Sequence, residues 1–67
     1  MRERIQEMVN AYGFGISVEK LVSELYWKLT IEGADACIVN GRYLEVDGVN
    51  YQLKKTRSKG HWTVVEI

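Results

Sequence analysis

The side chains best suited to binding a ligand lie in one basic segment, Lys54 to Gly60. This segment reads Lys-Lys-Thr-Arg-Ser-Lys-Gly and carries four basic residues. Lysine and arginine neutralise phosphate groups, and a hydroxyl or a glycine amide can donate a hydrogen bond to a phosphate oxygen. The sequence therefore predicts a nucleic-acid contact through Lys54, Lys55, Arg57 and Lys59.

Three side chains elsewhere in the sequence extend this predicted surface. Arg42 is a further cation, and Tyr43 and Trp62 are aromatic rings of the kind that stack on unpaired bases. The alternative is a solvated hairpin, because lysines on an edge strand also prevent edge-to-edge aggregation. Both interpretations stay open at the level of the sequence.

Catalytic and metal-binding patterns are weak throughout the chain. His61 follows Ser58 closely, but neither an orienting carboxylate nor an oxyanion hole accompanies the pair, so we expect a solvated loop there. Cys37 falls in an apolar run and is expected to be a buried, inert thiol. One cysteine and one histidine cannot build a Cys/His zinc site. The sequence predicts a protein that is not an enzyme and needs no metal or cofactor.

The charge and the composition narrow the class of protein further. Nine basic and nine acidic residues give a formal net charge of zero, and 46% of the 67 residues are hydrophobic. This composition predicts one small folded domain that spans the whole chain, 1–67, rather than a disordered or strongly basic protein. No secretory signal or long apolar span is expected, which favours a cytoplasmic location and no membrane partner.

Two periodicities predict the elements that position these residues. Apolar side chains recur at helical spacing over 2–12 and 18–31, with Ser17 as an N-cap and Gly33 as a stop signal. Alternating segments follow, separated by the hairpin dipeptides Asn40-Gly41 and Asp47-Gly48. The predicted strands cover 36–39, 42–46, 49–56 and 61–67.

These elements predict an α+β fold in which an N-terminal helical hairpin packs on one face of a four-stranded antiparallel β-meander. The alternative is a winged-helix-like domain, in which the second helix recognises a ligand and residues 42–67 form the wing. Winged-helix domains usually have a third helix, which this pattern lacks.

The expected strand register leaves an apolar outer face. A two-residue turn at Asp47-Gly48 pairs Val46 with Val49, and a three-residue loop ending at Gly60 pairs Leu53 with Val65. The face away from the helices then holds four apolar side chains, Ile38, Tyr43, Trp62 and Val64. Such a face predicts a protein partner or a homodimer. A register that is wrong by one residue, or a helix covering this face, is the alternative.

Trp27 is a separate candidate for a protein contact. At 100° per residue it points away from the buried stripe of the second helix, where it could anchor a partner. Alternatively, the ring packs on the first helix or on the edge of the sheet. The sequence thus predicts a small binding module, with nucleic acid as the first candidate partner and a protein or a second copy as the alternative.

Overall fold

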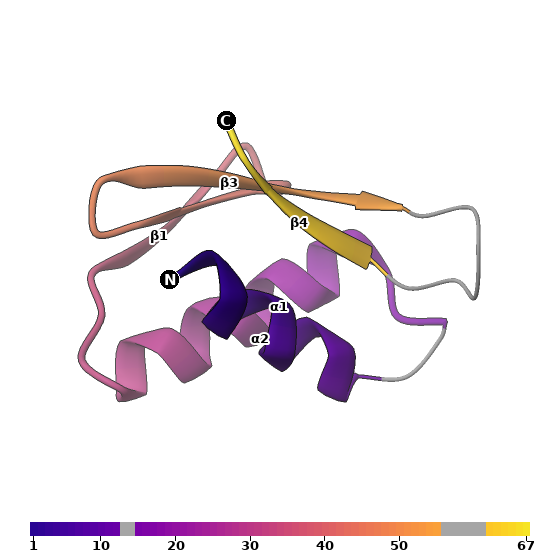
Figure 1. The fold of residues 1–67 in the computed structure, drawn as a ribbon, viewed down its shortest axis with the longest axis horizontal. Helices are drawn as coiled ribbons and strands as arrows, with labels where there is room; N and C mark the ends of the chain where they lie inside the picture. Colours follow the sequence, from indigo (N-terminus) through magenta and orange to yellow (C-terminus); the bar gives the residue numbers. More distant parts are fainter. Residues whose placement is uncertain (13–14, 56–61) are drawn as a thin grey trace.

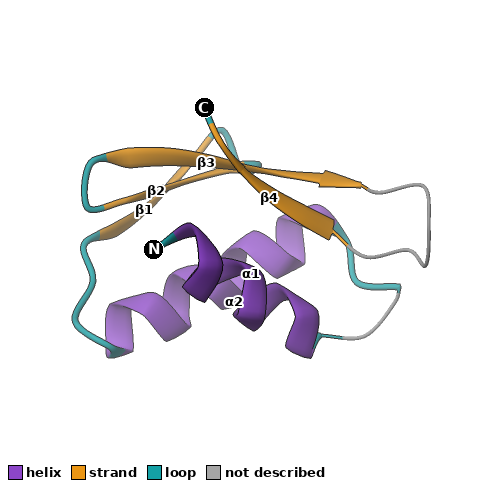
Figure 2. Ribbon diagram, in the orientation of Figure 1, coloured by secondary structure: helices purple, strands orange, loops and turns teal. Residues whose placement is uncertain are grey.

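The structure is a computed structural model that describes residues 1–12, 15–55 and 62–67. Two helices lie against one face of an antiparallel sheet whose strands follow the order β1-β2-β3-β4 (Figures 1 and 2). The elements are α1 (Arg2–Ala11), α2 (Val18–Ile31), β1 (Ala36–Val39), β2 (Tyr43–Val46), β3 (Val49–Lys55) and β4 (Trp62–Glu66). This arrangement confirms the predicted helical hairpin on a meander.

The core lies between the helices and the sheet and is built by the predicted apolar stripes. Burying one such leucine, isoleucine or valine contributes roughly 1.5–3 kcal/mol, so the core is the main source of stability. Its members are Ile5, Met8 and Val9 of α1, Leu21, Val22, Leu25 and Leu29 of α2, and Leu44, Val46, Tyr51, Leu53 and Val64 of the sheet.

Both ends of α2 are set by the predicted residues. The Ser17 hydroxyl accepts a hydrogen bond from the Lys20 amide at 3.3 Å, which satisfies one of the free donors of the first turn. At the other end Gly33 has a φ of +94°. This conformation lets the Ala34 amide donate to the Leu29 carbonyl at 2.9 Å, which closes a Schellman motif.

The hairpin between β2 and β3 has the predicted turn and the predicted register. Asp47 and Gly48 have φ angles of 51° and 84°, as a type I′ turn requires. Val46 pairs with Val49, and Leu44 pairs with Tyr51. One face of this hairpin therefore enters the core, as expected.

The hairpin between β1 and β2 differs from the prediction by one residue. Val39 pairs with Tyr43, so Arg42 falls outside the ladder and the connection has three residues instead of two. Ile38 consequently pairs with Leu44 and turns toward the core. The prediction that Ile38 lies on the outer face is wrong, because a shift of one residue moves every side chain of a strand to the opposite face.

The pairing of β3 with β4 is also shifted by one residue. Leu53 pairs with Val64, not with Val65. Val64 is 0% exposed, and Trp62 packs partly buried against the core. The prediction that both residues face outward is therefore wrong. The expected loop at 58–60 lies outside the described residues.

Candidate nucleic-acid interface

The candidate site is a hollow beside the start of β2, where β3 extends beyond its pairing with β2. β2 begins at Tyr43, while β3 runs on to Lys55 with only β4 beside it. The hollow next to this overhang has a volume of about 190 Å³. Its lining residues are Val18, Arg42, Tyr43, Gln52, Leu53 and Trp62. Three of the residues predicted to bind nucleic acid thus meet in one place.

Arg42 reaches this hollow because it lies outside the β1–β2 ladder. Its Nε atom lies 3.5 Å from Oε2 of Glu19 in the first turn of α2. Both side chains are more than half exposed, at 67% and 59%. An exposed ion pair of this kind is weak, so the guanidinium can exchange Glu19 for another anion at little cost.

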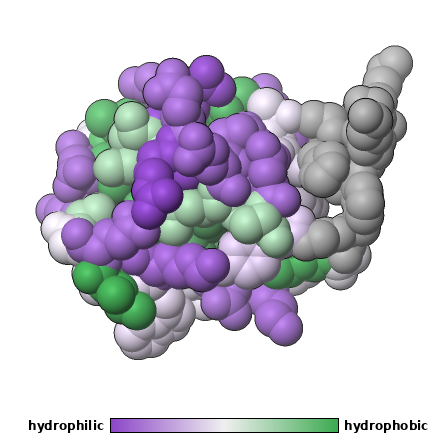
Figure 3. Space-filling view, turned by 60° about the horizontal axis from the view of Figure 1, so that its bottom comes forward, coloured by the Kyte–Doolittle hydropathy of each residue, from purple (hydrophilic) through white to green (hydrophobic). Residues whose placement is uncertain are grey.

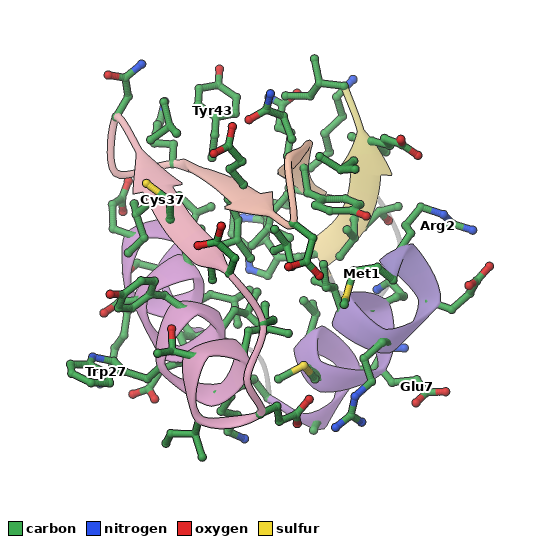
Figure 4. All side chains as sticks on the ribbon, turned by 90° about the vertical axis from the view of Figure 1, so that its left-hand side faces the viewer. Met1, Arg2, Glu7, Trp27, Cys37 and Tyr43 are labelled. Atoms are coloured by element: carbon green, nitrogen blue, oxygen red, sulfur yellow. The ribbon has the colours of Figure 1, made fainter. Side chains whose placement is uncertain are left out.

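The two aromatic rings approach the hollow from different sides of the sheet. Tyr43 projects from the face opposite the helices (Figure 4), beside Gln52 on β3. Trp62 lies on the helix side, opposite Lys55. Because both rings are partly buried, each already has a defined position before any ligand binds.

Gln6 is a residue that sequence reasoning missed. Its Nε2 atom donates to the Trp62 carbonyl at 3.0 Å, and its Oε1 atom accepts from the Val64 amide at 2.8 Å. The side-chain amide therefore pairs with the edge of β4 as a neighbouring strand would, and it fixes the backbone of Trp62. The only sequence signal is a polar residue beside the buried stripe at Ile5.

The basic segment is described only in part. Lys54 and Lys55 are exposed at the end of β3, where alternation directs them to opposite faces of the sheet. Arg57 and Lys59, together with Ser58 and His61, lie outside the described residues. The described part of the predicted basic surface therefore consists of Lys54, Lys55 and Arg42.

The predicted apolar outer face is not assembled as expected. Of its four members only Tyr43 lies there. A shallow hollow on that face has three hydrophobic and two amide residues in its lining, which are Val39, Tyr43, Asn50, Gln52 and Ile67. Cys37 is exposed on the same face, because it alternates with the inward-facing Ile38. The expectation of a buried thiol is therefore wrong.

Trp27 is exposed, as its helical position predicts. The side chain is 59% exposed and projects from α2 away from α1 (Figure 4). Its ring meets Tyr26 edge to face at 5.7 Å between centroids. Because Trp27 points away from α1, the alternative of packing on α1 is wrong. Ile31, one turn later, is 80% exposed. The helix side carries hydrophobic spots separated by hydrophilic side chains (Figure 3).

Neither a metal-binding cluster nor a membrane-spanning helix is found in the part of the chain that the structure describes. Over residues 1–12, 15–55 and 62–67, no cluster of three histidine, cysteine, aspartate or glutamate residues could hold a metal ion. None of the described helices is both long and apolar enough to cross a membrane.

Comparison with known proteins adds no family to this geometry. The chain matches no protein-family model, no curated protein and no solved structure. The hollow and the charges beside it are therefore the features of the chain that bear on its function.

Proposed function

We propose that this chain is a non-catalytic module that binds single-stranded nucleic acid. The observation that carries the proposal is the hollow in which Arg42, Tyr43 and Trp62 meet beside the exposed Lys54 and Lys55. Aromatic rings supply stacking surfaces, and the cations supply phosphate contacts. These are the two components from which proteins that bind single strands are built.

The size of the hollow favours a group that belongs to a larger ligand. A volume of about 190 Å³ is below the 300–1,000 Å³ typical of sites for whole cofactors or drug-sized molecules. One flat ring would occupy the hollow while the remainder of the ligand runs across the surface. A nucleic-acid strand fits this arrangement, because one base can enter the hollow while the charged backbone stays on the surface.

A single strand fits this site better than a duplex. A base that stacks on Tyr43 or Trp62 must be unpaired, because bases within a duplex already stack on each other. The backbone of such a strand would pass along the end of β3, where Lys54 and Lys55 lie on opposite faces. The formal net charge of zero means that attraction comes from this local cluster alone.

A fluorescence titration tests the proposal. The variant Trp27→Phe leaves Trp62 as the reporter, and single- and double-stranded oligonucleotides are added at about 50 and 200 mM salt, the range over which phosphate contacts weaken sharply. We expect quenching by the single strand at low salt, strong weakening at high salt, and a smaller response to the duplex. An unchanged Trp62 signal at low salt would refute the proposal.

A protein-interaction module is the second candidate, and it is favoured by the exposure of Trp27. A tryptophan 59% exposed beside Tyr26 is the kind of side chain that dominates binding at protein interfaces. This candidate needs neither the hollow nor the lysines. Its test is a pull-down with Trp27→Ala against the unaltered chain: a partner retained equally by both would rule out Trp27 as the anchor.

A further inference from the structure

The two edge strands of the sheet, β4 and β1, differ in how their outward backbone groups are covered. At the β4 edge, Trp62 and Val64 direct their backbone polar groups away from β3. The Gln6 side-chain amide donates to the Trp62 carbonyl and accepts from the Val64 N–H. Helix α1 lies along this edge (Figure 1). Open strand edges recruit other strands, so covering one in this way is a protective feature.

The β1 edge has no such cover from the described residues. The Asp47 amide donates to the Asp35 carbonyl at 2.9 Å, so Asp35, Cys37 and Val39 direct their polar groups toward β2. By alternation, Ala36 and Ile38 direct theirs outward. Within the described part of the chain, the polar group that approaches this edge is the Cys37 thiol, 3.8 Å from the Ile38 carbonyl.

The side chains of β1 also lack the usual protection of an edge strand. The strand reads Ala-Cys-Ile-Val, with no charge and no proline. Natural edge strands commonly carry a lysine, a proline or a bulge that blocks further pairing. Shortness is the only such feature that β1 has.

We propose that β1 pairs antiparallel with β1 of a second copy of this chain, about a two-fold axis that passes beside Cys37. Ala36 then lies opposite Ile38 of the partner subunit, and Ile38 opposite Ala36 of the partner subunit. The two sheets join into one. This proposal names a partner for the protein-interaction candidate and is independent of nucleic-acid binding.

A second copy is favoured because this edge is complementary to itself. In the stated register each outward N–H and C=O of Ala36 and Ile38 meets its counterpart, which gives four backbone hydrogen bonds with no group left over. The chain has a formal net charge of zero, so two copies do not repel each other overall. Trp27 projects on the same side of the molecule as β1 (Figure 4), which gives this side apolar surface as well.

The register places the two Cys37 residues directly opposite each other. Their own polar groups point toward β2, so they form a non-hydrogen-bonded pair, in which the Cα atoms lie about 4.5 Å apart. This separation falls within the range of about 4.4–6.8 Å found for disulfides. The exposed thiol therefore reports the pairing directly.

Sedimentation and oxidative cross-linking, both without nucleic acid, test the proposal. We expect a species of twice the 7.7 kDa chain mass at high concentration. We also expect a covalent dimer after addition of diamide, which takes up the two protons and two electrons that the thiols lose. A strictly monomeric mass up to millimolar concentration, with no covalent dimer, would overturn the proposal.

Matched variants separate this edge from other surfaces. Cys37→Ser should keep the dimer, whereas Cys37→Lys should abolish it, because two ammonium groups would face each other across the axis. In Cys37→Ser/Asn50→Cys the thiol moves to an exposed position on β3, and the covalent dimer should be lost. Ala36→Pro removes an outward N–H at the first residue of the strand, where proline is tolerated, and should also give a monomer. A dimer that survives both Cys37→Lys and Ala36→Pro would contradict the assignment.

The oligonucleotide titration on Cys37→Lys distinguishes this proposal from the proposed function. Binding retained by a monomeric Cys37→Lys variant would show that the two are separate. A Cys37→Lys variant that stays dimeric and binds would count against the β1 pairing alone, and an unaltered chain that dimerises without binding any oligonucleotide would refute the proposed function alone.

Discussion

Arg42 is a single residue whose position outside the strand pairing bears on both a hairpin register and the candidate site. By falling outside the β1–β2 ladder it turns Ile38 into the core and leaves Leu53 without a partner on β2. The hollow lies beside this gap. Arg42, one of the residues that line this hollow, is also a source of positive charge beside it.

Removing Lys54 and Lys55 together should weaken nucleic-acid binding and its dependence on salt. For single strands, removal of one phosphate contact reduces the slope of log K against log salt by about 0.7. We expect the slope of the double alanine variant to be smaller by about 1.4 according to that rule. The control, Arg2→Ala/Lys20→Ala, removes two exposed charges elsewhere. Equal slopes for the two variants would contradict the assigned phosphate contacts.

Removing the negative charge of Glu19 should strengthen binding. Glu19 lies 3.5 Å from Arg42 and competes with phosphate for the guanidinium. Because exposed pairs contribute about 0.2–1 kcal/mol, Glu19→Gln should tighten binding by at most about fivefold at low salt. Glu7→Gln, an exposed carboxylate on α1, is the matched control and should have no effect. Weaker binding by Glu19→Gln would show that Arg42 needs its partner.

Tyr51 should make the fold sensitive to alkaline pH. Burial raises the pKa of the Tyr51 phenol above 10.0, and the negative charges of Glu66 and Asp47 raise it further. The unfolded chain therefore loses this proton at lower pH than the folded chain does, so the stabilisation is present below about pH 10 and is lost as the pH rises through the folded pKa. Urea unfolding from pH 7 to 11 should show a steeper loss above pH 10 than in Tyr51→Phe. If the stability of the unaltered chain and that of Tyr51→Phe fell in parallel with pH, Tyr51 would not be the cause of the alkaline sensitivity.

At the scale of elements, the sequence predicts the existence and type of each helix and strand better than the register of the strand pairs. Both helices, the turn at Asp47-Gly48 and the β2–β3 pairing follow from local signals such as the Ser17 cap. The predictions for Ile38, Trp62 and Val64 place these residues on the wrong face because each depends on the register of two paired strands, which no local pattern determines. The error is one residue in each case, yet it reverses the face of the residue and takes three of the four predicted members out of the outer apolar face.

The cover of the β4 edge should contribute measurably to stability. Gln6→Leu leaves the Val64 amide and the Trp62 carbonyl without their partner. An unsatisfied, partly buried group costs about 1–3 kcal/mol, so the free energy of unfolding should fall by that amount. Glu7→Ala, the exposed neighbour, should change the free energy of unfolding by less than about 0.5 kcal/mol. A similar change for both variants, measured by urea unfolding, would remove Gln6 from this role.

At the scale of the whole molecule, the helices cover one face of the sheet and leave the other open. The sequence predicts this layering, because amphipathic helices and alternating strands must share a core. It does not predict the candidate site in full. The meeting of Arg42, Tyr43 and Trp62 depends on where β2 begins relative to β3, which is a tertiary property.

The bond between Gln6 and Trp62 also has a consequence for the order of folding. Its two residues are 56 positions apart, whereas each hairpin of the sheet joins segments that are neighbours in sequence. Local pairings form early because little chain entropy is lost, and closing nearly the whole chain costs the most. We expect the hairpins to form first and the docking of α1 on β4 to complete the native state. The same glutamine that shields an edge would then mark the final step of the folding reaction.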